Sequence, residues 1–136
     1  MDINKMREII DVLKLEEGYV IDNESALVGY GIISQTNILD LYVTPEILER
    51  LSKIPRCIHF NSSYTKNNFI ILNISDVQIL CSVILPNDKR FNFAVKYNGL
   101  YLNHIDIIDT YFRTRKNVPY KLLKSIATFR NKLLNV

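Results

Sequence analysis

The chain of 136 residues is long enough for one domain with a hydrophobic core. Apolar residues make up 48% and charged residues 23%, which excludes a disordered chain, and the net charge of +3 is too small to identify a partner. The N-terminus lacks a secretory signal pattern, and no apolar run reaches the length of a membrane span, so we expect a cytoplasmic protein without membrane contact.

The N-terminal half alternates helices with strands. Apolar residues recur at helical spacing after Asp2, which is a favourable N-cap, and Pro45 fits the first turn of a helix that ends before Pro55. The elements expected here are a helix over residues 3–15, a strand over 19–21, a short helix through 26–28, a strand over 38–43 and a helix over 45–54.

The middle of the chain is predicted to be β-structure, and the end helical. Alternating apolar residues favour a strand over residues 91–97, and Asn98-Gly99 is typical of a type I′ hairpin turn. Asn103 is the expected cap of the following helix. The remaining expectations are strands over 57–60, 69–72, 75–85 and 100–102, a loop over 61–68, and a last helix over 122–133.

This order predicts an α+β fold in one domain, residues 1–136. We expect a mixed, largely antiparallel β-sheet, with the N-terminal helix and two C-terminal helices packed on it.

Asp40 is unusual because aspartate is depleted in strands, and a buried carboxylate needs hydrogen bonds, a charge partner or a metal. It is either a residual metal ligand or a structural residue that caps a loop or pairs with a cation. Cys57 and Cys81 are expected to be buried thiols in strands. His59 and His104 are expected at the surface, so neither a zinc site nor a histidine-based triad is indicated.

Residues 19–44 (YVIDNESALVGYGIISQTNILDLYVT) resemble the opening of the polymerase-β-type nucleotidyltransferases, especially minimal, abortive-infection-type members. That family shows a strand, a Gly-Gly or Gly-Ser pair, a helix start and a Thr-x-Asp-x-Asp strand. The resemblance implies a nucleotidyltransferase-like fold. In an active member, carboxylates would hold two Mg²⁺ ions for attack on an α-phosphate, and the helix N-terminus would approach the triphosphate.

The sequence departs from this pattern at the implied catalytic positions. Ile38 stands where the first carboxylate would be, which leaves Asp40. The third carboxylate falls on Gln78, or on Asp76 on the same strand face. Asp40, Asp76 and Gln78 are thus vestigial catalytic residues, and Asp40 is the candidate metal ligand.

The phosphate-binding turn departs from the pattern as well. Asn23-Glu24 replaces the glycine pair, and Glu24 places a negative charge where phosphate would lie. Ser25 is kept just after this pair. It is the candidate nucleotide contact, although a serine at a helix start is also a common cap.

The C-terminal segment from Thr110 to Val136 contains seven basic residues and no acidic ones. Such clustering attracts phosphate backbones through counterion release, but it is also found on solvated helix faces and in patches for acidic protein partners. The candidate binding residues for nucleic acid or a protein partner are Arg113, Arg115, Lys116, Lys121 and Lys124.

These observations favour a catalytically inactive nucleotidyltransferase-like protein that binds or regulates an unknown protein or nucleic acid and needs no cofactor. One alternative is an active, divergent Mg²⁺-dependent enzyme that uses Asp40 with Asp76 or another acid to transfer a nucleoside monophosphate to RNA, protein or a small molecule. Another is a nucleic-acid binder that uses the basic C-terminal helices.

Overall fold

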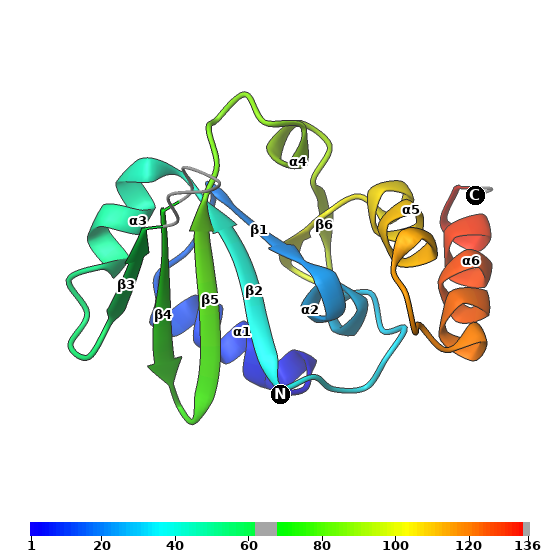
Figure 1. The fold of residues 1–136 in the computed structure, drawn as a ribbon, viewed down its shortest axis with the longest axis horizontal. Coiled ribbons are helices and arrows are strands. Elements are labelled where there is room, and N and C mark those ends of the chain that lie inside the picture. The colour runs from blue at the N-terminus through cyan, green and yellow to red at the C-terminus, as the bar shows by residue number, and fades with distance from the viewer. Residues whose placement is uncertain (62–67, 135–136) are drawn as a thin grey trace.

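The computed structural model describes residues 1–61 and 68–134. The expected α+β fold is confirmed: helices pack on one mixed sheet with the strand order β3-β4-β5-β2-β1-β7-β6 (Figure 1). The helices are α1 (Ile3–Val12), α2 (Asn23–Gly29), α3 (Pro45–Leu51), α4 (Lys89–Asn92), α5 (Ile105–Thr114) and α6 (Tyr120–Leu134). The strands are β1 (Tyr19–Asp22), β2 (Ile38–Val43), β3 (Ile58–Asn61), β4 (Asn68–Ile74), β5 (Val77–Val83), β6 (Val95–Tyr97) and β7 (Leu100–Leu102).

Most neighbouring strands are antiparallel, and the two parallel contacts lie at the centre of the sheet. β2 runs parallel to β5, and β1 runs parallel to β7. Between these contacts, β1 and β2 pair antiparallel, so that Asp22 lies opposite Asp40. The sheet therefore places the end of β1 beside the middle of β2.

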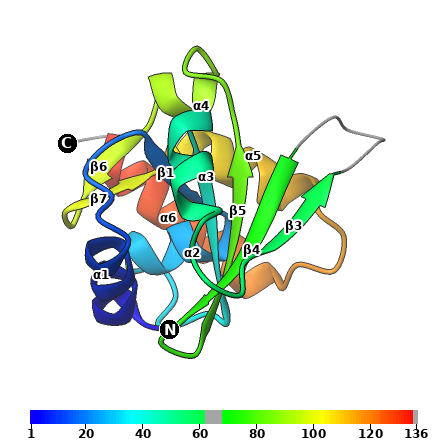
Figure 2. The same ribbon diagram turned by 90° about the vertical axis from the view of Figure 1, so that its left-hand side faces the viewer.

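The helices cover the two halves of the sheet differently. Helices α1 and α3 lie behind β2, β5 and β4 in Figure 1, and Figure 2 shows the same arrangement from the side. Helices α2, α5 and α6 lie towards the end of the sheet that contains β1, β7 and β6 (Figure 1). Within the described ranges, no helix covers the front of β3, β4 and β5.

Burial along β2 follows this arrangement. Leu39, Leu41 and Val43 are buried on the side of α1 and α3, whereas Ile38, Asp40 and Tyr42 point to the other side. Alternation along a strand sends successive side chains to opposite faces. The bare side of the sheet is therefore the side on which Asp40 lies.

Helix α1 begins as expected, because the Asp2 side chain accepts a hydrogen bond from the Lys5 backbone N–H. It ends earlier than the predicted residue 15. Lys14 adopts a positive φ of 55°, and the chain leaves the helix there rather than at Gly18. Gly18 is left-handed, as predicted, but lies in the loop that leads to β1.

Two predicted strands in the middle of the chain are wrong in their bounds. Ser75 and Asp76 both have positive φ and form the tight turn between β4 and β5, so Asp76 is not on a strand. Residues 89–92 form the short helix α4, because the Asp88 carboxylate caps it by accepting from the Arg90 N–H. Strand β6 consequently covers only the last three residues of the predicted 91–97 strand.

The start of α5 also differs from the prediction. His104 is the N-cap, with its Nδ1 accepting from the Asp106 N–H, and it is partly buried rather than exposed. Asn103 is buried instead, and its side-chain amide donates to the Asp22 carboxylate at 3.0 Å. This bond ties the start of α5 to the end of β1.

The cysteines and the remaining predicted segments show mixed agreement. Cys81 is buried in β5 as expected, but Cys57 is only partly buried and precedes β3. His59 is exposed, as predicted. Of the loop predicted over 61–68, residues 62–67 lie outside the described residues, whereas Asn61 and Asn68 belong to β3 and β4 rather than to a loop. Across the part of the chain that the structure describes, no helix is both long and apolar enough to cross a bilayer.

Gly29 provides a test of how closely α2 packs on the sheet. A Cβ atom there would lie 2.6 Å from Cδ2 of the buried Leu102 on β7. We predict that Gly29→Ala lowers the free energy of unfolding by about 1–3 kcal/mol, because overpacking outweighs the helix propensity of alanine. Urea unfolding measures this, and the loss should shrink in a Leu102→Val background. Equal losses in both backgrounds would contradict the predicted close contact.

Candidate functional site

The candidate site lies on the bare side of the sheet, where β1 ends and α2 begins. Asp22 closes β1, Asn23 begins α2, and Asp40 lies on the neighbouring strand β2. Asn23 has a φ of 53°, a left-handed conformation that asparagine tolerates better than most residues. This backbone geometry suits a glycine, as found at this position in the nucleotidyltransferase pattern.

Ser25 fixes α2 against β2. Its hydroxyl is fully buried, donates to the Ile38 carbonyl at 3.0 Å and accepts from the Asp40 N–H at 2.8 Å. Because β1 ends at Asp22, the Ser25 hydroxyl supplies hydrogen bonds to the backbone of β2 that a longer β1 would otherwise make. Both bonds are internal, so the structure gives Ser25 a structural role.

Asp22 is the acid that sequence reasoning missed. It lies directly opposite Asp40 in the β1–β2 ladder, and directly paired residues point to the same face. The available signal was that Asp22 directly follows the strand predicted over residues 19–21. Asp76, the acid that we expected as the partner, lies in the β4–β5 turn and is exposed.

The Asp40 carboxyl lies in an unfavourable place for a negative charge. Its pKa is raised from 3.8 to about 6, mainly by burial and in addition by the nearby Glu24 and Asp22 carboxylates. A hydrogen bond from the Asn23 side chain acts in the opposite direction and lowers it. Among the described residues no lysine or arginine forms an ion pair with Asp40, which argues against pairing with a cation, one of the alternatives that the sequence left open.

The residues on this face do not fit a two-metal centre. Ile38 pairs with Gln78 across β2 and β5, and Asp40 pairs with Leu80, so neither neighbour on β5 supplies a carboxylate. Among residues 1–61 and 68–134, no group of three or more His, Cys, Asp or Glu side chains could hold a metal ion. Two-metal phosphoryl transfer needs several oxygen ligands around each ion, and this donor set lacks them.

A cavity of about 310 Å³ is lined by Asp22 and Asn23 and is bounded by α4 and α5. The Arg90 guanidinium lies 4.2 Å from the centre of the Tyr42 ring and forms two hydrogen bonds with Asp88. Arg90 therefore covers the end of β2 beyond Asp40. Tyr111 from α5 also lines this cavity.

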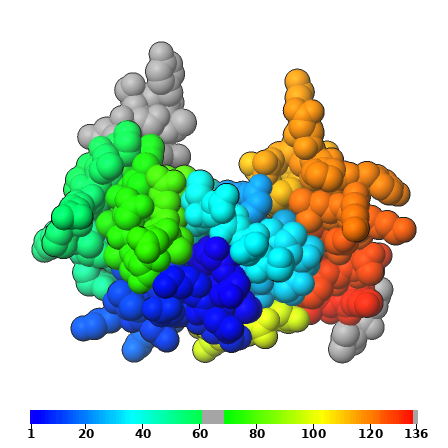
Figure 3. All heavy atoms as spheres, turned by 90° about the horizontal axis from the view of Figure 1, so that it is seen from below, coloured from blue at the N-terminus to red at the C-terminus, as the bar shows by residue number. Residues whose placement is uncertain are grey.

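The basic segment is partly neutralised by ion pairs. Arg115 binds Glu24 at 2.7 Å, and Arg113 binds the buried Asp109. Lys116, Lys121 and Lys124 have no ion pair among the described residues. The Arg115–Glu24 pair joins the α5–α6 turn to the first turn of α2, so this turn borders the Asp40 site. Figure 3 shows the turn, in orange, projecting beside a hollow over the strands.

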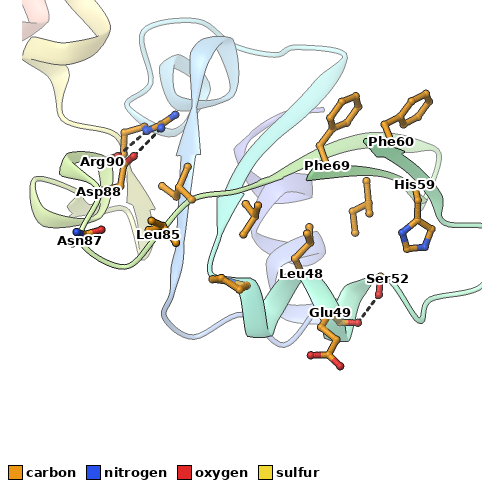
Figure 4. Close-up of a pocket in the computed structure, with 14 residues that line it drawn as sticks. Leu48, Glu49, Ser52, His59, Phe60, Phe69, Leu85, Asn87, Asp88 and Arg90 are labelled. Carbon is orange, nitrogen blue, oxygen red and sulfur yellow. Dashed lines mark hydrogen bonds and ion pairs between the residues drawn. The ribbon is translucent and has the colours of Figure 1, made fainter. Parts of the chain in front are cut away.

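A larger cavity of about 760 Å³ lies between α3, the sheet and the loop that follows β5. His59 and Leu48 point into this space (Figure 4). Phe60 and Phe69 point away from α3, towards the bare side of the sheet (Figure 4). This cavity contains none of the site residues expected from the sequence.

The role of Ser25 can be tested by removing its hydroxyl. Ser25→Ala leaves a buried N–H and a carbonyl without partners, so we expect a loss of about 1–3 kcal/mol in the free energy of unfolding. Ser125→Ala is the matched control, because the Ser125 hydroxyl is exposed and bonds only the Lys121 carbonyl of its own helix. Equal, small losses in chemical denaturation would show that the Ser25 bridge is unimportant.

The raised pKa of Asp40 makes stability depend on pH. Between about pH 4 and 6 the unfolded carboxyl ionises while the folded one retains its proton, so stability falls as pH rises through this window. We predict that Asp40→Asn raises the free energy of unfolding by about 2 kcal/mol at pH 7.5 and by little at pH 4.

Thermal unfolding across this pH range measures the difference, and Asp40→Glu, which keeps an acid, should retain the fall in stability. The assignment would be refuted if the stability of the wild type rose between pH 4 and 7 and the stability of Asp40→Asn rose by the same amount.

Comparisons with known proteins are consistent with this geometry. No known family model matches the sequence, and no curated protein matches it. A crystal structure of a putative nucleotidyltransferase from Thermotoga maritima matches with a TM-score of 0.60 and 14% identity, over 100% of this chain and 97% of that one.

Two Helicobacter pylori structures match 80% of this chain. They are JHP933, with a TM-score of 0.53 and 16% identity, and a putative nucleotidyltransferase, with a TM-score of 0.50 and 18% identity. The match spans 53% and 55% of those proteins, about half their length. At these identities the similarity is one of fold, and it shows that the chain has a nucleotidyltransferase-like fold.

Proposed function

We propose that this protein is a catalytically inactive nucleotidyltransferase-like scaffold that acts as a binding or regulatory module. The main support for the proposal comes from the residues at the position where the sequence resemblance implies metal ions. Ile38 and Gln78 lie side by side there, and the neighbouring Asp40 faces Leu80. A hydrocarbon, an amide and one carboxyl of raised pKa do not make a two-metal site.

The start of α2, where a triphosphate would bind in an active member of the family that the sequence resembles, supports the same proposal. Glu24 lies in the first turn of α2, where it repels an anionic ligand, and its partner Arg115 is held by that pair. The Ser25 hydroxyl is buried and fully used by the β2 backbone. A triphosphate would therefore meet a carboxylate rather than a free hydroxyl.

The competing hypothesis is a divergent enzyme, and one observation favours it. Asp22 and Asp40 face each other across β1 and β2, next to the cavity lined by Tyr42 and Tyr111. Against it, the Asn103 amide donates to Asp22, and this bond has a structural purpose in joining β1 to α5.

Nucleic-acid binding through the basic helices is the other alternative. Arg113 and Arg115 are engaged with Asp109 and Glu24, so much of their charge is compensated within the protein. Lys116, Lys121 and Lys124 would then carry most of the attraction for phosphate. Because this attraction comes from counterion release, such binding would weaken steeply with salt.

Nucleotide assays test the proposal. We predict that titration of the purified protein with each NTP and Mg²⁺ gives no saturable binding, and that labelled NTPs with RNA or protein acceptors give no transfer. Transfer or Mg²⁺-dependent binding that is lost in both Asp40→Asn and Asp22→Asn would overturn the proposal.

A matched gain-of-function variant tests the inferred position of the metal site. Ile38→Asp combined with Gln78→Asp adds two paired acids on β2 and β5, next to Asp40, which makes three. This variant should gain Mn²⁺ binding, measured by electron paramagnetic resonance, whereas the wild type should not. Equal Mn²⁺ binding in both would contradict the inferred metal position.

A further inference from the structure

Strand β3 forms one edge of the sheet, and its outer side has no strand beside it. Among the described strands it pairs only with β4, over residues 58–61 (Figures 1 and 2). In an antiparallel pair, about half of the backbone N–H and C=O groups of an edge strand point away from the sheet. Within the described residues, no backbone–backbone hydrogen bond outside the β3–β4 ladder involves β3. The outer side of β3 can therefore accept another strand.

The two edges of the sheet differ in how they are protected against such pairing. Natural edge strands are commonly very short, or carry a charged residue, a proline or a bulge. The opposite edge, β6, is three residues long and has the exposed Lys96 at its centre. β3 has the sequence Ile-His-Phe-Asn, without acid, lysine, arginine or proline, and its register with β4 is continuous. Of the two edges, β3 is the one that is open to pairing.

The side chains of β3 restrict which strand can be added. Ile58 is 51% exposed and Phe60 is 41% exposed, and both lie on the front of the sheet. His59 points to the other side, towards α3 (Figure 4). The Phe60 ring stacks on the Phe69 ring with centroids 4.9 Å apart, so its position is fixed from the side of β4. An added strand that covers Ile58 and Phe60 must be extended, uncharged and apolar at alternate residues.

β3 itself meets these requirements. An antiparallel pair of two β3 strands centred on His59 places His59 opposite the partner's His59, and Ile58 opposite the partner's Phe60. Residues that lie directly opposite each other point to the same face, so Ile58 and Phe60 of both copies form one apolar group on the front. The two-fold symmetry makes the contact reciprocal, which is the usual arrangement in dimers of identical chains.

Pairing between unlike edges fits less well. A contact between β3 of one copy and β6 of the next leaves a free edge at each end, so it forms an open chain of copies rather than a closed dimer. It also brings Lys96 to a strand that offers no acidic residue. The β3–β3 pair opposes no charged lysine or arginine in either copy.

We propose that two copies of this chain form a symmetric dimer through antiparallel pairing of β3, centred on His59. The two seven-stranded sheets then continue into one another. The inference goes beyond the proposed function, because it does not depend on whether the Asp40 site is active. Since each copy adds only a short strand to the contact, the dimer is a weak one, with a Kd on the order of 50 μM.

Sedimentation of the full-length protein tests the dimer and its register. Between about 5 and 500 μM the wild type should pass from monomer to dimer. His59→Lys and His59→Glu should each weaken self-association about fivefold, because like charges then lie directly opposite each other at the two-fold axis. An equal mixture of these two variants should recover dimers of about wild-type strength, since a lysine then opposes a glutamate.

Two further variants separate β3 from the rest of the surface. Phe60→Ser should weaken the dimer about tenfold, because it removes apolar area from the contact. Lys96→Glu on β6 is the matched control, since it changes the charge of the opposite edge and should leave the dimer unchanged. Circular dichroism of every variant verifies that it is folded.

Four outcomes would overturn the inference. They are a wild type that stays monomeric throughout the concentration range, a dimer that His59→Lys leaves intact, a mixture of the His59 variants that associates no better than either alone, and a dimer that Lys96→Glu weakens as much as Phe60→Ser does. A monomeric wild type would leave the edge of β3 to a strand of a different protein.

Discussion

The two hydrogen bonds of the Ser25 hydroxyl hold the site together. β1 ends at Asp22, and beyond it the backbone of β2 would lack a partner on that side without Ser25. By bonding the Ile38 carbonyl and the Asp40 N–H, the hydroxyl fixes the first turn of α2 against β2. The positions of Asn23 above Asp40 and of Glu24 beside Arg115 both follow from this contact.

The two halves of the sheet also differ in how they are covered. On one side, Ser25 ties α2 to β2 and Asn103 ties the start of α5 to β1. On the other side, no helix within residues 1–61 and 68–134 covers the front of β5, β4 and β3 (Figure 1). Asp40 and Tyr42 lie on the boundary, on the strand that pairs with β1 on one side and with β5 on the other.

Sequence reasoning recovered what local patterns determine. The bounds of β2, the helix after Pro45 and the turn at Asn98 were all predicted, because alternation, proline position and turn residues act locally. The same reasoning failed where the position of a residue depends on a partner far away in the sequence. Asn103 was expected to cap α5, but it reaches Asp22 from far along the chain. The partner of Asp40 was expected at Asp76, whereas strand pairing selects Asp22.

The raised pKa of Asp40 follows mainly from its burial on an apolar part of the sheet face. A divalent ion favours ionised carboxylates, and ionised carboxylates favour a wet, polar face. Here Leu80 lies across from Asp40 and Ile38 lies two residues before it, so the same face resists charge and holds the carboxyl pKa near 6. Ile38 and Leu80, which lie beside Asp40 on this face, therefore disfavour the ionised carboxylate that a divalent ion would require.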